Sequence, residues 1–301
     1  MGRSALLFAT IAAAWGGCTV VKSFAFLPGA LQQASSCKPA PMRRTFARSL
    51  LMRSNEAVTE SAEYFENKEA LKQDLRDEYA SFFDNFESDR YLPDVQFIDP
   101  VTSFTGFQNY KKNLDMLGGR SALGNILFKD ASIILHDIEE PGPFRLRTRW
   151  TLTVCFKALP WRPVPCFTGI SEYTVDDQAR VVRQVDYWDS INLVGGRYQA
   201  VSALQGVRDF VGQVLPSPGE RADGLLLRRA KDYEVRRLEG GEVVALREID
   251  DTPTDYSSAL MESLSMDGLE AVGEPELSSP GSRLRGQVSV RLASHDWMTS
   301  S

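Results

Sequence analysis

Hydrophobic residues in the first part of the chain recur every three or four positions, which is the spacing of one face of a helix. Over residues 62–86 this stripe predicts a helix, formed on its buried side by Leu71, Leu75, Tyr79, Phe82 and Phe86. Pro93 is expected in the connection that follows, because proline interrupts both helices and central strands.

A second helix is predicted from Thr105 to Leu117, and a third from Tyr198 to Val214. Thr105 and Gln108 have the spacing of a capping box, and the pair Gly118-Gly119 is typical of a helix C-terminus. The third helix is expected to stop before Pro216.

Between these helices the hydrophobic period changes to two, the spacing of a strand with one buried face. In the strand predicted over residues 144–157, one face carries Leu146, Trp150, Leu152, Val154 and Phe156, and the other carries Arg145, Arg147, Arg149 and Lys157. Flanking strands are predicted at Leu127–Ile138, Cys166–Val175 and Arg180–Ser190. Helices, then an antiparallel meander, then a helix predict an α+β fold.

Three short segments within this arrangement are Phe97-Ile98-Asp99-Pro100, FTGFQNY at residues 104–110 and GISEY at residues 169–173. With the order of elements, they resemble the nuclear transport factor 2-like (SnoaL-like) fold. The closest resemblance is to the plant and algal plastid type of that superfamily, to which no function is assigned. The resemblance implies a domain over residues 62–215 with a cone-shaped, curved antiparallel sheet, packed with helices that enclose a pocket.

A second resemblance begins after that domain. The run LLLRRAKDYEVRR at residues 225–237, followed by EVVAL at residues 242–246, resembles the first hairpin of the SOUL haem-binding family. Leu238 stands where that family has a second tyrosine. We therefore expect a partial SOUL-like β-hairpin over residues 222–249. Residues 250–301 are rich in Ser, Gly, Pro and acids without a sustained period, and a disordered tail is predicted there.

The N-terminus has the composition of a targeting sequence. Residues 1–55 contain no Asp or Glu and seven Lys or Arg, and an apolar run from Ala5 to Trp15 fits a signal peptide that ends at Ser23-Phe24-Ala25. We predict a signal peptide over residues 1–25 and a plastid transit peptide over residues 26–55. This two-part leader resembles that of algae with secondary plastids, and the alternative is a secretory signal followed by a basic linker.

Charge and length limit the functions of the remaining chain. The formal net charge of −6 becomes −13 for residues 56–301, which disfavours a nucleic-acid-binding surface. The apolar run at the N-terminus is too short to cross a bilayer of about 30 Å as a helix, so no membrane span is expected in the mature chain. The sequence has two histidines, so we expect no zinc site of the usual kind.

The candidate site residues are those expected near the pocket of the cone. Asp99 and Asp186 are candidates for a general base and its partner if burial raises a carboxyl pKa. The alternative places Asp99 as a turn cap before Pro100 and Asp186 on a solvated sheet edge. Trp150, Tyr173, Trp188 and Tyr110 are the expected ligand-binding residues, and His136 is a candidate haem ligand or a surface side chain.

Two further patterns leave alternatives open. Cys155 and Cys166 flank the Pro-rich loop and predict either a regulatory disulfide or two unreactive thiols. The arginines at 145, 147 and 149 predict either a site for an acidic group, such as a porphyrin propionate, or a solvated outer sheet face.

The sequence therefore supports three hypotheses of function. The first is a plastid protein that binds a hydrophobic small molecule without catalysis, with haem or another tetrapyrrole as the ligand implied by the second resemblance. The second is a SnoaL-like isomerase or cyclase with Asp99 or Asp186 as the base. The third is an interaction module that forms a homodimer through the open sheet face.

Overall fold

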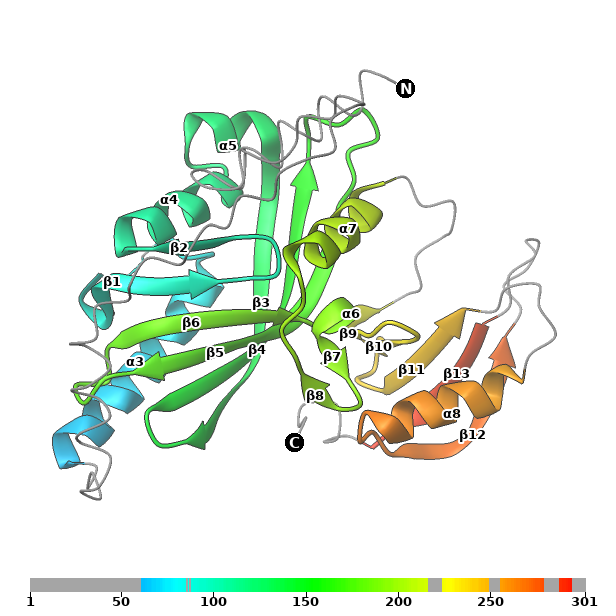
Figure 1. Cartoon of the computed structure of the whole chain (residues 1–301). Coiled ribbons are helices and arrows are strands. Elements are labelled where there is room, and N and C mark those ends of the chain that lie inside the picture. The colour runs from blue at the N-terminus through cyan, green and yellow to red at the C-terminus, as the bar shows by residue number, and fades with distance from the viewer. Residues whose placement is uncertain are drawn as a thin grey trace, which may run out of the picture. The chain divides into compact units, whose positions relative to one another are not determined.

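The computed structural model describes residues 61–84, 86, 88–215, 224–248, 255–278 and 287–293. In these residues the chain forms a six-stranded, a five-stranded and a two-stranded sheet together with helices (Figure 1). The fold is thus mixed α+β with mainly antiparallel sheets. The predicted signal and transit peptides lie outside the described residues.

The six-stranded sheet contains the four predicted strands and two more. Its order is β2 (Ser103–Thr105), β1 (Tyr91–Ile98), β6 (Val181–Trp188), β5 (Cys166–Val175), β4 (Arg145–Phe156) and β3 (Phe128–Gly142). Neighbouring strands pair antiparallel except β1 and β6, which pair parallel. The sheet therefore brings β1, early in the domain, beside β6, late in the domain.

Strand β1 was not predicted, because Pro93 lies inside it. The placement of Pro93 in a connection is wrong. The pairing of β1 with β6 shifts register between Tyr91 and Gln96, and a proline without an amide hydrogen is tolerated at such an irregularity. Beyond the shift, Gln96, Phe97 and Ile98 pair regularly with β6.

Helix α3 (Ala62–Ala80) is shorter than the predicted helix over residues 62–86. The chain leaves the helix at Phe82 and Phe83, whose φ angles are 50° and 56°. Both rings are nevertheless buried, so they continue the hydrophobic stripe from a turn instead of a helix. A short 3-10 helix (Ser88–Arg90) precedes β1.

Helix α4 (Phe107–Leu117) begins two residues later than predicted. The N-cap residue is Gly106, which has a φ of 99° and offers no side-chain cap. The predicted capping box of Thr105 and Gln108 is therefore wrong, and Thr105 is instead the last residue of β2. Helix α5 (Ala122–Leu127) was not predicted and precedes β3. A capping box does occur at Ser202 and Gln205, which begins helix α7 (Ala203–Val214).

Short elements connect β6 to α7. Helix α6 (Asp189–Asn192) continues directly from β6, and β7 (Leu193–Val194) pairs with β8 (Arg197–Tyr198). Tyr198 therefore lies in a strand and not in the predicted third helix. Gly206 of α7 packs against the backbone of Pro100, so close that an added Cβ would lie 2.1 Å from the Pro100 carbonyl oxygen.

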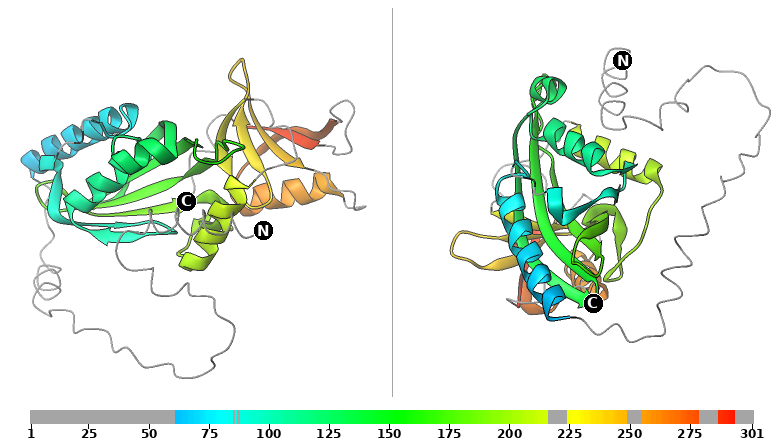
Figure 2. Two further views of the ribbon diagram at one scale, coloured as in Figure 1. Left: turned by 90° about the horizontal axis from the view of Figure 1, so that it is seen from above. Right: turned by 90° about the vertical axis from the view of Figure 1, so that its left-hand side faces the viewer.

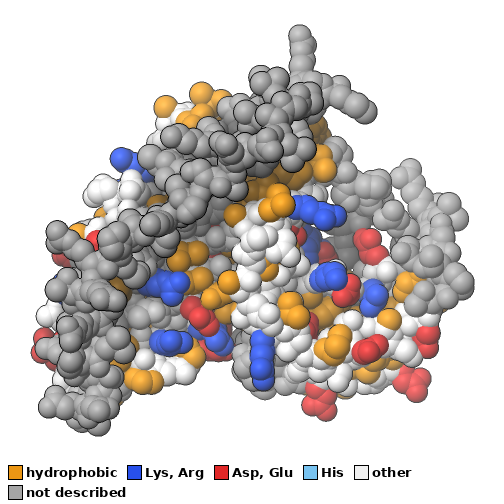
Figure 3. All heavy atoms as spheres, viewed as in Figure 1, with side chains coloured by type: hydrophobic (Ala, Val, Ile, Leu, Met, Phe, Trp, Pro, Cys, Tyr) orange, Lys and Arg blue, Asp and Glu red, His pale blue; other side chains and the backbone are white. Residues whose placement is uncertain are grey.

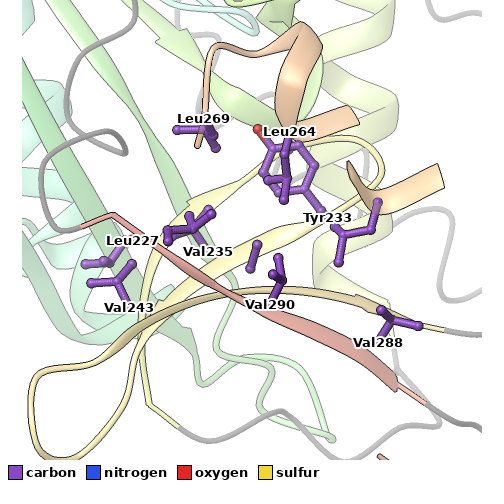
Figure 4. Close-up of a cluster of buried hydrophobic side chains, with 12 residues drawn as sticks. Leu227, Tyr233, Val235, Val243, Leu264, Leu269, Val288 and Val290 are labelled. Carbon is purple, nitrogen blue, oxygen red and sulfur yellow. The ribbon is translucent and has the colours of Figure 1, made fainter. Parts of the chain in front are cut away.

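The C-terminal part is a five-stranded sheet with one helix. Its order is β12 (Ala271–Ser278), β13 (Gln287–Leu292), β11 (Val243–Glu248), β10 (Glu234–Arg237) and β9 (Leu225–Arg229), all antiparallel. Helix α8 (Tyr256–Met266) lies against this sheet (Figure 2). Leu227, Val235, Val243, Val288, Val290 and Leu264 form one buried cluster (Figure 4).

The predicted disorder of residues 250–301 is wrong for residues 255–278 and 287–293. Leu260 and Leu264 are one helical turn apart and fully covered, at 0 % and 1 % exposure. Helix α8 and strands β12 and β13 contain few apolar residues, but these pack against the apolar face of the hairpin formed by β10 and β11. On the face shown in Figure 3, charged side chains of both signs lie among several groups of hydrophobic side chains.

Candidate active site

Three cross-strand rows line the face of the six-stranded sheet that α3 and α4 contact. Thr148, Ser171 and Asp186 are neighbours across β4, β5 and β6. Leu146, Tyr173 and Gln184 form the next row, and Trp150, Gly169 and Trp188 form the third. Alternate residues of a strand share a face, so Trp150, Tyr173, Asp186 and Trp188, all candidates from the sequence, lie on this inner face.

Helix side chains complete the wall with hydrogen bonds. The Tyr79 hydroxyl of α3 lies 2.9 Å from the Thr148 hydroxyl and 3.1 Å from the Tyr173 hydroxyl. Trp150 Nε1 donates to Ser171 Oγ at 2.9 Å. Burial raises the pKa of Tyr79 to about 12, helped by the negative charge of Asp186, so this hydroxyl stays protonated.

Tyr110 of α4 reaches the same face through Gln184. Its hydroxyl donates to Gln184 Oε1 at 2.6 Å, and Gln184 Nε2 donates to Asp186 Oδ1 at 2.9 Å. The Tyr110 ring is stacked on Phe97, with ring centroids 5.0 Å apart. The inner face is therefore aromatic on one side of Gln184 and acidic on the other.

Asp99 lies beside Asp186. In the parallel pairing of β1 with β6, Phe97 is the partner of Gln184 and Ile98 the partner of Val185. The next position of this register places Asp99 next to Asp186. Because Asp99 follows Phe97 by two residues, its side chain lies on the same face of the sheet as that of Phe97. Asp99 Oδ1 accepts hydrogen bonds from the Val101 and Thr102 amides at 2.7 and 2.6 Å, so it does cap the turn at Pro100.

Both carboxyls are surrounded by protein but keep some exposed surface. Burial raises the pKa of Asp99 to about 7, and the charge of Asp186 adds to the increase. Burial raises the pKa of Asp186 to about 6, against the opposing effect of hydrogen bonds from Gln184 and Ser171. Asp186 lies on an interior strand of the sheet and not at an edge. Near neutral pH the pair can thus hold one proton between two carboxyls.

Sequence reasoning missed Tyr79, Thr148, Ser171 and Gln184 as members of this wall. Tyr79 fitted the core stripe of a helix, and its hydroxyl gave no signal. Thr148 lies between the inward residues Leu146 and Trp150, Ser171 precedes the inward Tyr173, and Gln184 is itself buried. A polar residue in the buried phase of a period-two pattern was the available signal, because such groups need a buried partner.

The opposite face of the sheet holds a buried ion pair. Arg149 donates to both carboxylate oxygens of Asp189, at 3.1 and 2.6 Å, and also to the Leu227 carbonyl. Arg149 is 3 % exposed, so a solvated face is wrong for this arginine, whereas Arg145 is exposed. Arg147 pairs with Glu172 at 2.9 Å.

Strand β9 contacts this outer face through its backbone. Thr151 donates to the Leu226 carbonyl at 2.8 Å, and the Arg229 amide donates to Thr168 Oγ1 at 2.7 Å. A homodimer through this part of the outer face would therefore require displacement of β9.

His136 is not part of the inner wall. His136 Nε2 lies 2.8 Å from Thr151 Oγ1, on the face of the sheet opposite to Trp150 and Tyr173. Burial lowers the pKa of His136 to about 4, and Arg149 adds to the decrease, so the ring is neutral at pH 7. A separate pocket of about 490 Å³ is lined by Arg76 and Ala80 of α3 and by residues 133–138 of β3. His136 therefore does not fit an axial ligand for a haem held in the inner face.

Cys155 and Cys166 are not joined in a disulfide bond, and Cys155 is buried whereas Cys166 is partly exposed. Within the described residues, His, Cys, Asp and Glu side chains do not gather in groups of three that would hold a metal ion. None of the described helices combines the length and hydrophobicity needed to cross a membrane.

Part of the chain is similar to one family model and to several solved structures. An NTF2-like protein of unknown function from Exiguobacterium sp. 255-15 has 13% identity and a TM-score of 0.30, with 38% of this chain and 98% of that one covered. An LEH-like epoxide hydrolase from Mycobacterium tuberculosis has 16% identity and a TM-score of 0.32, covering 42% and 84%. The epoxide hydrolase/cyclase-like enzyme SalBIII of salinomycin formation has 10% identity and a TM-score of 0.33, covering 41% and 90%.

The curated proteins include no match to this sequence. A family model matches a segment of the chain that includes Asp99 and Gln184 and ends two residues before Asp186. Residues 69–184 match the family model described as "Uncharacterized conserved protein (DUF2358)".

Proposed function

We propose that the domain over residues 68–215 binds a small, largely apolar molecule and transfers a proton on it at the Asp99–Asp186 pair. The observation that carries this proposal is the register of β1 and β6, which, continued by one position, puts Asp99 next to Asp186, together with the effect of the Asp186 charge on the pKa of Asp99. The reaction class is isomerisation or cyclisation, in which a base removes a proton and an acid returns one.

The surroundings of the two carboxyls suit this chemistry. Trp150, Trp188 and Phe97 are buried side chains of the same sheet, and neither carboxyl forms an ion pair with a Lys or Arg of the described residues. A carboxyl pair without a nearby cation shares protons in the neutral range. One ionised Asp then accepts a proton from the substrate while the protonated Asp donates one to another substrate atom, so the proton count of the pair is conserved.

Deuterium exchange tests this proposal without a known substrate. The full chain is incubated in D₂O with a panel of small ketones and epoxides, and deuterium incorporation or product formation is followed by mass spectrometry. We expect turnover for at least one compound and its loss in Asp99→Asn and Asp186→Asn. Asp94→Asn is the matched control, because Asp94 is exposed on β1.

Non-catalytic binding of a hydrophobic small molecule is the second candidate. The observation that favours it is that the Tyr79 hydroxyl is hydrogen-bonded to the Thr148 and Tyr173 hydroxyls, so these three groups are already engaged with protein partners. Ligand-induced stabilisation in thermal unfolding without any deuterium exchange would support binding over catalysis.

Haem remains a separate proposal for the ligand, and the position of His136 argues for a binding mode without that residue. Haemin added to the full chain tests it: a Soret shift supports tetrapyrrole binding, and we expect His136→Ala to leave it unchanged. Dimerisation is tested by light scattering. Delivery to a plastid through residues 1–55 is likewise a proposal, tested by the location of a fluorescent fusion in algal cells.

A further inference from the structure

A cavity of about 490 Å³ lies between helix α3 and strand β3, away from the carboxyl pair. Arg76 and Ala80 line it from the helix, and residues 133–138 line it from the strand. Strands β4 and β5 separate β3 from Asp186 on β6. The volume is within the range of about 300–1,000 Å³ that is usual for small-molecule sites. The proposed proton transfer does not account for this cavity.

The cavity reaches both faces of the sheet at its edge. Among the described strands, β3 is the outermost of the six-stranded sheet, and six consecutive residues of it line the cavity. Because side chains of a strand alternate between faces, such a lining includes side chains of both faces. The pairing with β4 shifts register at His136, which changes the phase of the alternation there. The lining residues on the inner face are Ile133, Leu135 and Ile138, and those on the outer face are Ile134, His136 and Asp137.

The inner part of the cavity is apolar and incompletely covered. Ile133, Leu135 and Ile138 are only half-buried. On the adjacent strand β4, by contrast, the inward side chains of Leu146 and Trp150 are 0 % and 3 % exposed. Apolar surface that stays in contact with water is unfavourable, and a hydrocarbon group in the cavity would cover it. The inner part therefore suits the apolar portion of a ligand.

Arg76 supplies a positive charge to this inner part. Lys68, Lys72 and Arg76 follow one another at intervals of four along α3, so they lie on one side of the helix. The two lysines share one partner, Glu140 of β3, at 2.6 and 2.9 Å. Arg76 forms no ion pair or side-chain hydrogen bond with any residue that the structure describes. Its guanidinium is therefore available to an anionic group.

The acidic member of the lining belongs to the outer part. Asp137 is the register partner of Arg149, whose side chain lies on the outer face, and its Oδ1 accepts a hydrogen bond from the Ile138 amide at 2.8 Å. His136, also on the outer face, is neutral at pH 7. The charge next to the apolar inner part is thus that of Arg76.

We propose that this cavity binds a small amphipathic carboxylate, such as a medium-chain fatty acid. Arg76 holds the carboxylate, because its planar guanidinium can donate two parallel hydrogen bonds to it. The hydrocarbon chain lies against Leu135 and Ile138. The site goes beyond the proposed function and does not depend on it, since the carboxyl pair of Asp99 and Asp186 repels a second anion.

Isothermal titration calorimetry of the full chain with octanoate tests the charge. We expect saturable binding, and weaker binding of octan-1-ol and octylammonium, which have the same chain without a negative charge. In Arg76→Gln the Kd of octanoate should rise by about threefold to tenfold, because the ion pair is partly solvated. Arg76→Lys should lose less. Lys112→Gln is the matched control, because it removes an exposed positive charge from α4.

Two further variants test the position. Ala80→Phe should fill the inner part and abolish octanoate binding without lowering the thermal midpoint, because Ala80 is exposed on its helix. Asp137→Asn, in the outer part, should leave the affinity unchanged or slightly higher. In ¹H–¹⁵N NMR spectra, octanoate should shift the amide signals of residues 76–80 and 133–138 most.

Several results would overturn this site. They are the absence of saturable octanoate binding, equal Kd values in Arg76→Gln and the unmodified chain, octan-1-ol binding as tightly as octanoate, and unimpaired binding in Ala80→Phe. Loss of octanoate binding in Asp186→Asn would also overturn it, because it would locate the ligand at the carboxyl pair. Deuterium exchange is not part of these readouts, so the proposed function and this site can fail separately.

Discussion

Arg149 and Asp189 form a buried ion pair in which both carboxylate oxygens accept hydrogen bonds from the guanidinium. The two side chains are 3 % and 0 % exposed, and Tyr198 and Thr168 also donate to Asp189. Although burial disfavours its charge, Arg149 and these hydrogen bonds hold the pKa of Asp189 below its ordinary value. The pair links β4, the start of α6 and the backbone of β9.

Removal of one member should destabilise the fold strongly. We expect Arg149→Met to reduce the free energy of unfolding by about 3–5 kcal/mol, because Asp189 would remain buried and charged without its partner. Urea unfolding measures the change, and Arg145→Met, on the same strand but exposed, is the control. The double variant Arg149→Met/Asp189→Leu should lose less than the sum of the two single variants; strict additivity would show that the pair is not coupled.

The carboxyl pair predicts a pH dependence of opposite sign to that of Asp189. A raised folded pKa means that the folded state binds the proton more tightly, so Asp99 and Asp186 oppose folding above about pH 7 and this effect disappears as the pH falls toward 4. We expect Asp186→Asn to be more stable than the unmodified chain at pH 8 by roughly 1–2 kcal/mol, with a smaller difference at pH 5. Asp94→Asn should show no such trend, and a difference independent of pH would contradict the raised pKa.

The pKa of Asp189 is lowered in the folded state, as is usual for a carboxyl group with a positively charged partner. Its lowered pKa contributes stability that is present above about pH 4 and is lost as the pH falls through the folded value. Acid unfolding of the unmodified chain should therefore begin below pH 4, whereas Asp189→Asn should lack this phase. Equilibrium unfolding at pH 2–5 measures both.

Gly206 controls the distance between α7 and the turn that holds Asp99. An added Cβ would lie 2.1 Å from the Pro100 carbonyl oxygen, so Gly206→Ala must move either α7 or the turn. We expect loss of stability and a changed Asp99 titration. Gly212 on the same helix has open space around it, and Gly212→Ala should instead stabilise by about 0.5–1 kcal/mol, the helix propensity of alanine. Equal effects of the two variants would contradict the close packing at Pro100.

Leu264 tests whether α8 is a folded part of the chain. It is 1 % exposed, and Leu264→Ala should cost about 2–5 kcal/mol through a cavity under the helix. Met266→Ala is the control, because Met266 is 60 % exposed. Amide hydrogen exchange should show protection over residues 256–266 that Leu264→Ala reduces; exchange without protection would support the original prediction of disorder.

Much of the six-stranded sheet followed from local pattern. The period-two alternation located β4, β5 and β6, because a strand with one buried face needs apolar residues at every second position. Strand β1 and the end of α3 did not follow, since Pro93 and the turn at Phe82 and Phe83 are tolerated only through contacts made elsewhere in the fold. Helix α8 was not predicted, because it buries only two residues, Leu260 and Leu264, and the apolar period is correspondingly weak.

In the candidate site, too, some features followed from the sequence and others depended on the tertiary structure. The sequence by itself determined that Trp150, Tyr173 and Asp186 lie in predicted strands, and the resemblance to the NTF2-like fold placed them, with Asp99 and Trp188, near a pocket. Only the tertiary structure decided that Asp99 lies beside Asp186, because this depends on parallel pairing between strands about ninety residues apart. It also decided that His136 and Arg149 belong to the other face and that Gln184 joins Tyr110 to Asp186. Neighbours across a sheet depend on which strands pair and in which register, and local periodicity carries no information about either.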